Sequence, residues 1–448
     1  MAQKETRELS QGHPRKNAYT STVAQKYSRG RSPYLKRRVV VTGIGAVSPN
    51  GIGREVFWAA TLRGESGVRP IERFDVTGMA VRIAGQVENF NELAYVSVKD
   101  RPHVSRAAPF AIAAAGEALT DAGLDPFTMT RNQLREIGVV VGSGAASWEF
   151  TERQYDLYYT GRQKECSVYV VPTSTPGTLA SEVSMRFGLR GYSHLLSNGC
   201  TSSTDAIGYA YRAIAFGNLD TIVAGGVDTP LAPQIMRGFI IMRIMSSRWN
   251  AEPTRASRPF SKDRDGFVVA EGAWFFLLEE RERALARGAH IYGEIKGYGS
   301  TCEAFHRVRL EECGEEPARA MGLALAEAGL APEAIDYVSY HGTSTELNDR
   351  IETKAIHLAF GAHAPKLPGS ALKSIIGHPQ GACGAAGLAA TLLGMRDGIM
   401  HGTINLETPD PECDLDYIAG TARPMQVENA VCNCIAFGSK NSALVVGR

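Results

Sequence analysis

The sequence lacks any long apolar run, although 44% of its 448 residues are hydrophobic. No stretch approaches the ~18–20 apolar residues that span a bilayer, and the N-terminus lacks the apolar centre of a secretory signal. A chain with this share of hydrophobic residues buries a large core, which excludes disordered and collagen-like proteins. We therefore expect a folded protein without a membrane span.

Cysteine is sparse, and its spacing fits neither a disulfide framework nor a zinc site. The eight cysteines include one close pair, Cys432 and Cys434, with C-x-C spacing rather than the C-x-x-C of zinc ligands. This usage favours a reducing compartment, so we expect a cytoplasmic protein with no bound metal. We interpret the seven cysteines other than Cys200 as packing residues, the commonest role of an unpaired cysteine.

There is also little net charge, but the formal value of +1 conceals an asymmetry. Residues 1–38 hold ten lysines and arginines against two glutamates, whereas the remainder has 38 basic and 45 acidic residues. Residues 1–38 show no apolar periodicity, which predicts a basic extension outside the core. A solvated tail, a contact arm for an acidic partner and a transit peptide all stay open. The acidic remainder argues against a nucleic-acid partner.

The body of the chain alternates predicted strands with predicted helices. A β-branched run at residues 38–43 predicts a buried strand, and Gly43-Ile44-Gly45 imitates a dinucleotide fingerprint but lacks its third glycine. Further predicted elements are a helix at 107–122 and strands at 137–141 and 219–224. Such alternation indicates parallel α/β layers.

Two segments of the body look alike, which suggests two similar halves at residues 39–295 and 296–448. In the first, an apolar run at 195–199 leads to Cys200 and then a helix; in the second, a run at 373–377 leads to His378 and then a small-residue helix. We interpret both runs as strands. Chance similarity between α/β units stays an alternative.

Cys200 is the strongest single candidate for a catalytic residue. A thiol at a helix N-terminus faces unpaired N–H groups and the positive end of the helix dipole, and both can lower its pKa below ~8.5. The sequence thus predicts a nucleophile, with a buried structural cysteine as the alternative.

Two of the ten histidines, His341 and His378, stand next to glycines where strands are expected to end. Loops at the carboxyl ends of strands bind ligands in α/β proteins, and glycine neighbours let a substrate come close. One such histidine is more often a packing residue. Two of them, together with Cys200, favour a Cys-His-His centre.

Five separated motifs stand in one order along the chain. They are Gly199-Cys200-Thr201-Ser202; Arg258-Pro259-Phe260 with Gly266-Phe267 and Glu271-Gly272; His341-Gly342-Thr343-Ser344-Thr345; Lys373-Ser374-Ile375-Ile376-Gly377-His378; and Ala436-Phe437-Gly438. Over about residues 38–448, their order and spacing resemble the β-ketoacyl-acyl-carrier-protein synthases of the thiolase superfamily. Within that family, the residues from Gly199 to Ala210 look most like the α-subunit ketosynthases of type II polyketide synthases.

The resemblance implies a thiolase-like fold, a duplicated α/β/α/β/α layered arrangement, and an acyltransferase activity. It implies that Cys200 takes an acyl chain from an acyl-carrier protein as a thioester. The backbone N–H groups of Cys200 and Phe437 would form the oxyanion hole. No cofactor is expected, because phosphopantetheine arrives on the carrier protein.

The resemblance also implies roles for the second half. His341 and His378 would bind the malonyl thioester and stabilise the enolate that decarboxylation releases, which then attacks the acyl group. Lys373 would position His378, and Thr343 and Thr345 would line the phosphopantetheine arm.

Two positions depart from the family pattern. Most relatives carry a glutamate nine residues after the second histidine, which pairs with the lysine, whereas this chain has Gly387. Relatives that act on fatty acids often carry isoleucine where Ala145 stands, and a smaller residue predicts a more open acyl pocket unless neighbours such as Phe239 fill it.

We expect decarboxylative Claisen condensation in a type II polyketide or specialised fatty-acid pathway. A housekeeping 3-oxoacyl-acyl-carrier-protein synthase II performs the same reaction and stays an alternative. A chain-length-factor-like partner subunit usually lacks the cysteine, and a biosynthetic thiolase uses Cys-His-Cys. The expected partners are an acyl-carrier protein and a second subunit, in a homodimer or in a heterodimer with a chain-length-factor-like homologue.

Overall fold

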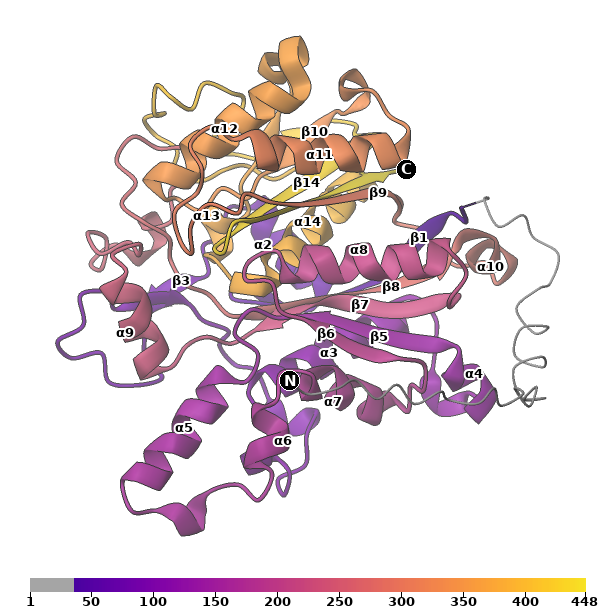
Figure 1. Ribbon diagram of the computed structural model, residues 1–448, viewed down its shortest axis with the longest axis vertical. Coiled ribbons are helices and arrows are strands. Elements are labelled where there is room, and N and C mark those ends of the chain that lie inside the picture. Colours follow the sequence, from indigo (N-terminus) through magenta and orange to yellow (C-terminus); the bar gives the residue numbers. More distant parts are fainter. Residues whose placement is uncertain (1–35) are drawn as a thin grey trace, which may run out of the picture. The chain divides into compact units, whose positions relative to one another are not determined.

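The computed structural model describes residues 36–448, of which Arg37–Arg448 form one compact unit (Figure 1). The predicted basic extension lies almost entirely outside the described residues, and the proposed boundary between halves at residue 295 stays a prediction. Within residues 36–448, no helix is long and apolar enough to cross a membrane.

Helices and strands alternate along the unit, with short 3₁₀ turns between them. The helices are α2 (Arg54–Leu62), α3 (Ala107–Asp121), α4 (Arg131–Arg135), α5 (Trp148–Tyr159), α6 (Val170–Ser174), α7 (Thr178–Phe187), α8 (Ser202–Ala215), α9 (Pro233–Ile241), α10 (Arg281–Ala286), α11 (Glu315–Ala328), α12 (Glu346–Phe360), α13 (Lys373–Ile376) and α14 (Cys383–Asp397). The strands are β1 (Val39–Ser48), β2 (Gly51–Ile52), β3 (Val68–Pro70), β4 (Ile83–Gly85), β5 (Ile137–Gly142), β6 (Ser193–Leu196), β7 (Thr221–Asp228), β8 (Gly272–Glu280), β9 (Gly293–Cys302), β10 (Tyr337–Ser339), β11 (Gly369–Ser370), β12 (Ile399–Met400), β13 (Arg423–Pro424), β14 (Asn429–Ala436) and β15 (Lys440–Gly447).

In the described part of the chain, eleven strands form one mixed sheet with an internal repeat. From the central pair β1 and β9, the order outward is β8, β7, β5, β6 on one side and β15, β14, β10, β11 on the other. On each side the first three pairings are antiparallel and the last two are parallel, or the reverse in chain order, so the two sides match strand for strand. The predicted duplication of the fold is confirmed.

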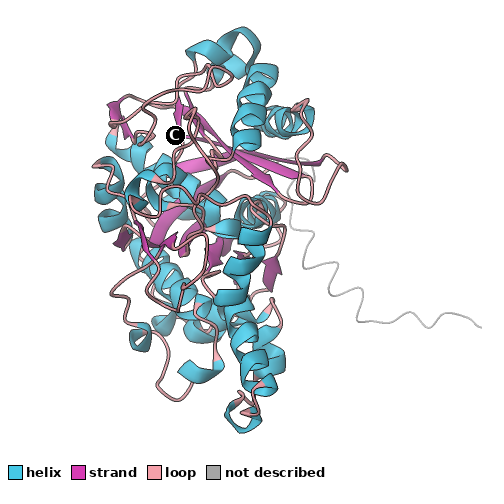
Figure 2. Cartoon of the chain, turned by 90° about the vertical axis from the view of Figure 1, so that its left-hand side faces the viewer, coloured by secondary structure: helices cyan, strands magenta, loops and turns pink. Residues whose placement is uncertain are grey.

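Helices cover and separate the two arms of the sheet. Helix α11 lies outside the arm that contains β9 and β14, helices α8 and α14 lie between the arms, and α3 lies outside the arm that contains β7 and β8 (Figure 1). The long strands thus run through the interior, with helices outside them (Figure 2). This is the expected thiolase-like α/β/α/β/α arrangement.

The glycines of the apparent dinucleotide fingerprint lie inside β1 and serve packing. A Cβ atom on Gly45 would stand 1.9 Å from the carbonyl oxygen of Ala114, and one on Gly43 would stand 2.0 Å from that of Ala118. Both oxygens belong to α3, whose buried face is largely alanine. Small residues on both elements therefore let the helix backbone approach the strand directly.

Most predicted elements are confirmed to within a few residues, and one interpretation is wrong. Residues 373–377 form the helical turn α13, which ends at Gly377 with φ of 76°, whereas the preceding strand is β11. All four residues of α13 are buried, and a short buried apolar run does not distinguish a strand from a helical turn.

The close contact between β1 and α3 predicts that Gly45→Ala is destabilising. The added methyl would force strand and helix apart, at a cost of roughly 1–3 kcal/mol or more. Gly322→Ala in α11 is the matched control, since nothing lies within 4 Å of its Cβ position; it should stabilise the protein by about 0.5–1 kcal/mol through helix propensity. Urea unfolding of both variants measures the two effects, and equal stability for Gly45→Ala and wild type would contradict the packing argument.

Candidate active site

Cys200 lies in the short connection between β6 and α8. The hydroxyl of Ser202 accepts from the N–H of Asn198 at 2.8 Å and donates to the carbonyl of Gly199 at 2.6 Å, which fixes the turn before the helix. The side chain of Cys200 is buried, with 6% of its surface exposed. The predicted place of this residue, between a strand and a helix start, is confirmed.

His378 meets Cys200 from the other half of the chain. Its Nε2 atom lies 3.2 Å from the Cys200 sulfur, although 178 positions separate the two residues. The backbone of His378 is held by an N–H bond to Val268 at 2.7 Å and by the Ala270 N–H, which donates to its carbonyl at 2.9 Å. Because the main chain is fixed on both sides, the imidazole has a defined position beside the thiol.

His341 completes the group at the end of β10. Its ring centroid lies 5.4 Å from that of His378. The ammonium group of Lys373 donates to the His341 carbonyl at 2.5 Å and lies 3.3 Å from its Nδ1. The carboxylate of Glu352, from α12, accepts the N–H groups of His341 at 2.6 Å and Gly342 at 2.7 Å. Both sides of the loop are therefore anchored.

Burial sets the protonation of all three groups. It raises the pKa of the Cys200 thiol, against a smaller opposite effect of the Phe437 backbone N–H, which hydrogen-bonds its sulfur. Burial, aided by the charge of Lys373, lowers the pKa of His341 to about 3, and burial also lowers the pKa of His378. The expectation that the helix N-terminus would lower the pKa of Cys200 is wrong, because desolvation of a fully enclosed sulfur outweighs the dipole. The resting centre is a neutral thiol beside neutral imidazoles.

A cavity of about 160 Å³ opens onto this centre. Its walls include Cys200, His341, His378, Phe437 and the two threonines, Thr343 and Thr345, whose hydroxyl oxygens lie 2.9 Å apart. The structure thus brings together seven of the nine residues singled out in the sequence, counting Lys373 through its contact with His341.

The two remaining residues, Ala145 and Phe239, do not line this cavity. Ala145 is buried in the loop after β5, where its N–H donates to the carboxylate of Asp228 at 2.8 Å. Phe239 of α9 packs edge-on against Phe267, which does line the cavity, with ring centroids 5.6 Å apart. Their predicted contact with the acyl chain stays a prediction.

Comparison with known proteins assigns the chain to a family. Residues 36–284 match the N-terminal domain of beta-ketoacyl synthases, and residues 292–407 match the C-terminal domain. The chain belongs to the β-ketoacyl synthase family.

Its relatives include proteins of both fatty-acid and polyketide synthesis. The 3-oxoacyl-[acyl-carrier-protein] synthase 2 of Synechocystis is 38% identical, over 91% of this chain and 97% of the relative. The ishigamide ketosynthase/chain length factor structure superposes with a TM-score of 0.84 at 32% identity, covering 92% of this chain and 99% of that one. A type II polyketide ketosynthase, solved in complex with its acyl-carrier protein and bound to the hexaketide, gives 0.83 at 33%, covering 92% and 99%. This β-ketoacyl synthase is therefore a condensing enzyme with 3-oxoacyl-acyl-carrier-protein synthase activity.

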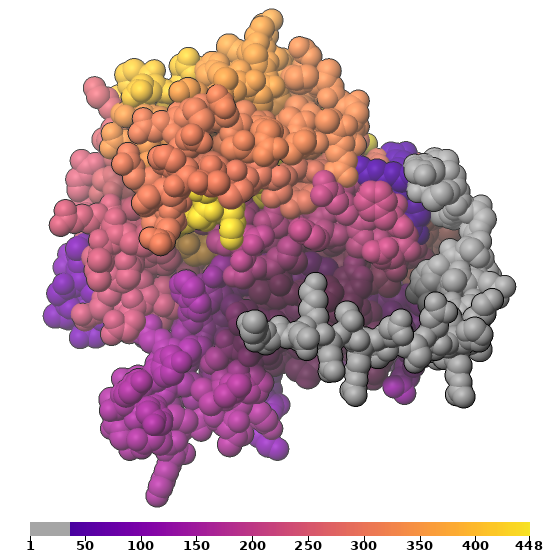
Figure 3. All heavy atoms as spheres, in the orientation of Figure 1, coloured from indigo at the N-terminus to yellow at the C-terminus, as the bar shows by residue number. Residues whose placement is uncertain are grey.

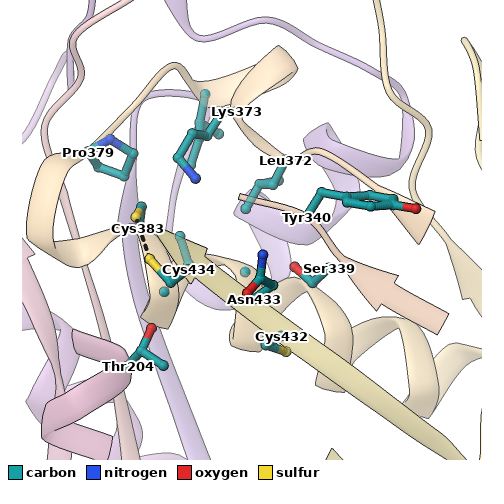
Figure 4. A pocket seen from close by; sticks show the side chains of 14 residues that line it. Thr204, Ser339, Tyr340, Leu372, Lys373, Pro379, Cys383, Cys432, Asn433 and Cys434 are labelled. Carbon is teal, nitrogen blue, oxygen red and sulfur yellow. Dashed lines mark hydrogen bonds between the residues drawn. The ribbon is translucent and has the colours of Figure 1, made fainter. Parts of the chain in front are cut away.

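Lys373 of this synthase lies beside a small cavity of about 10 Å³, which Gly387 also lines (Figure 4). Among residues 36–448, no carboxylate oxygen lies within ion-pair distance of the Lys373 ammonium, whose contacts are the ring nitrogen and carbonyl of His341. A Cβ atom on Gly387 would stand 2.8 Å from the Ser339 hydroxyl, so a larger residue there requires a shift of that side chain. The charge of Lys373 is left without the carboxylate that relatives resembling this chain provide.

The sequence analysis missed two further cysteines in this synthase. Cys383, at the start of α14, and Cys434, in β14, each donate to the carbonyl of Cys200, at 3.3 and 3.1 Å. They stand five residues after His378 and three before Phe437, so proximity to the motifs was a usable signal. The interpretation of all seven remaining cysteines as buried packing residues also fails at Cys302, which is exposed.

Proposed function

We propose that this β-ketoacyl synthase uses Cys200 as acyl acceptor and the His341–His378 pair to condense that acyl group with malonyl-acyl-carrier protein. The observation that carries the proposal is the 3.2 Å contact between the Cys200 sulfur and His378 Nε2 at the wall of the cavity. A thiol needs a base within hydrogen-bond reach to attack a thioester when burial holds it neutral.

Acylation begins with transfer of the Cys200 proton to His378 Nε2 as the sulfur attacks the thioester carbonyl. The oxyanion that forms is stabilised by the backbone N–H groups of Cys200 and Phe437, and the second of these already faces the sulfur. The proton on His378 then passes to the departing phosphopantetheine thiolate. Because burial disfavours a charged imidazole, the imidazolium is transient and the site returns to its neutral form.

Condensation depends on the hydrogen that His341 carries on Nε2. Lys373 donates toward Nδ1, at 3.3 Å, so the ring proton of the neutral imidazole resides on Nε2. That N–H can donate to the thioester oxygen of the malonyl group as decarboxylation turns it into an enolate. The carbanion carbon attacks the Cys200 thioester, a new carbon–carbon bond forms, and the Cys200 sulfur leaves as the chain returns to the carrier.

The partner that delivers both substrates is an acyl-carrier protein. Thr343 and Thr345 line the cavity and offer hydroxyl groups to the amides of a phosphopantetheine arm. The synthase structure with a TM-score of 0.83 was itself solved with its carrier protein. Neither step needs a cofactor bound to this chain.

We propose a second protein subunit at the edge of the sheet formed by β6. This terminal strand is only partly buried, and an exposed edge offers unpaired N–H and C=O groups to another strand. The nearby segment of α5 and α6 projects from the unit (Figures 1 and 3) and exposes large apolar side chains. These are Trp148, Tyr155, Tyr158, Tyr159, Val168, Tyr169 and Val171. Either a second copy or a chain-length-factor-like homologue, as in the ishigamide structure, fits such a surface.

For the pathway we propose type II polyketide or specialised fatty-acid synthesis, with housekeeping fatty-acid elongation as the alternative. The residues around Cys200 and the small Ala145 favour the first. The 38% identity to a synthase 2 keeps the second in view.

The mechanism predicts different defects for three variants. Cys200→Ala should abolish acyl loading. His341→Ala should still load acyl groups but lose CO₂ release from malonyl carrier by roughly 10²–10³-fold, the usual effect of losing one oriented donor. His378→Ala should be slow in both steps. Intact-mass analysis follows loading and a CO₂ assay follows decarboxylation; unchanged acylation in Cys200→Ala would overturn the assignment.

The pathway proposal predicts the products. Given malonyl carrier, a ketoreductase-free system and a chain-length-factor-like partner, a polyketide synthase condenses repeatedly to poly-β-ketoacyl chains. A housekeeping enzyme extends long saturated acyl carriers once and does so without a partner. Mass spectrometry of carrier-bound products separates the two, and efficient single extension of long saturated chains by the isolated protein would refute the polyketide proposal while leaving the condensing chemistry intact.

A further inference from the structure

A second thiol pair lies directly behind the acylation site. The sulfur atoms of Cys383 and Cys434 are 3.5 Å apart, and both residues are almost wholly buried, at 5% and 1% exposure (Figure 4). They pack with Cys200 and Ala436 in one cluster. Since Cys200 and Ala436 line the 160 Å³ cavity, the pair forms the next layer behind its wall.

The surroundings of Cys383 favour its thiolate form. It is the first residue of α14, a helix of 15 residues, so its sulfur is near the positive end of the helix dipole. The buried ammonium of Lys373 is nearby and has no carboxylate to balance it. Burial opposes ionisation, but the hydrogen bond from Cys434 and the charge of Lys373 together lower the pKa of Cys383 well below its ordinary value.

We propose that Cys383 and Cys434 form a peroxide-reactive thiol site that closes to an intramolecular disulfide, separate from the acylation chemistry of Cys200. Cys383 is the attacking sulfur, because it accepts the hydrogen bond and has the cation beside it. Cys434 is the resolving sulfur.

The chemistry requires a hydroperoxide as oxidant, and hydrogen peroxide is small enough to use the cavity beside Cys200. The Cys383 thiolate attacks one peroxide oxygen, the O–O bond breaks, and hydroxide leaves and takes up a proton as water. Cys383 is then a sulfenic acid. The Cys434 sulfur displaces its hydroxyl group as a second water, with loss of the Cys434 proton. Two thiols have lost two electrons and one peroxide has been reduced.

The geometry allows this bond with a small movement. The sulfurs must close from 3.5 Å to ~2.05 Å, the length of a disulfide bond. Cys383 stands at the beginning of its helix, where side-chain rotation does not disturb intrahelical hydrogen bonds. The new bond would join α14 to β14 and remove both S–H donors from the Cys200 carbonyl.

A metal site is the competing use of these atoms. His341 Nδ1 lies within 4.8 Å of both sulfurs, which makes three donor atoms for a soft cation such as Zn²⁺. The Lys373 ammonium, however, lies 3.3 Å from the same nitrogen. A fixed positive charge on that donor opposes a divalent cation, whereas it stabilises a thiolate. The observations therefore favour the disulfide.

The test treats the full-length protein with hydrogen peroxide, blocks free thiols and maps the peptides by mass spectrometry. Wild type should give a Cys383–Cys434 cross-linked peptide, lighter by two hydrogen atoms, that a thiol reductant removes. Cys434→Ser should instead trap Cys383 sulfenic acid, which dimedone labels. Cys432→Ser is the matched control, since Cys432 also faces α14, through Thr391 at 3.6 Å, but meets no thiol there; it should cross-link like wild type.

Two outcomes would overturn the proposal. One is the absence of the cross-link at peroxide concentrations that already oxidise Cys200. The other is protection of Cys383 and Cys434 from alkylation by added Zn²⁺ without any cross-link under peroxide, which would make the pair a metal site. A Cys383→Ser protein that shows no dimedone label apart from Cys200 supports the assignment of the attacking sulfur, and persistent Cys434 labelling there would contradict it.

Discussion

The contact between the Cys200 sulfur and His378 is the interaction on which the rest of the structure depends. Its two atoms come from segments 178 residues apart, so it exists only when both arms of the sheet are assembled. The duplicated topology provides that assembly, because it leads the corresponding connections β6–α8 and β11–α14 to the same place. The fold is thus a way to place a thiol from one repeat against an imidazole from the other.

Burial is the constraint that makes the pair work and also makes it hard to hold. It keeps the thiol and both imidazoles neutral, so the enzyme can offer uncharged donors where negative charge develops. Loops in such a place need internal partners for their N–H groups. Two buried carboxylates provide them: Asp228 accepts from Gly144 and Gly381, joining the two halves, and Glu352 accepts from His341. Burial raises the pKa of Asp228 to about 6 and that of Glu352 to about 7.

The parts of the site that sequence could predict are those carried by short local motifs. Cys200, His341 and His378 each stand next to glycines at the end of an apolar run, and this local signal survives without knowledge of the fold. The thiol pair escaped because Cys383 and Cys434 lie 51 positions apart and meet only through the packing of α14 on β14. The direction of the Cys200 pKa was mistaken for a related reason, since a helix start is visible in a sequence whereas desolvation is a property of the assembled core. Residues 373–377 were taken for a strand because a buried turn and a buried strand share the same apolar pattern.

The central claim is that Cys200 is a neutral thiol that His378 activates during attack. The most direct measurement is the pH dependence of Cys200 alkylation by iodoacetamide, followed by peptide mapping in a Cys383→Ser background. A neutral, buried thiol predicts a rate that keeps rising with pH beyond ~8.5, the ordinary pKa of cysteine, without a plateau below it. A rate that is already constant across neutral and mildly acidic pH would show a preformed thiolate and would contradict the account.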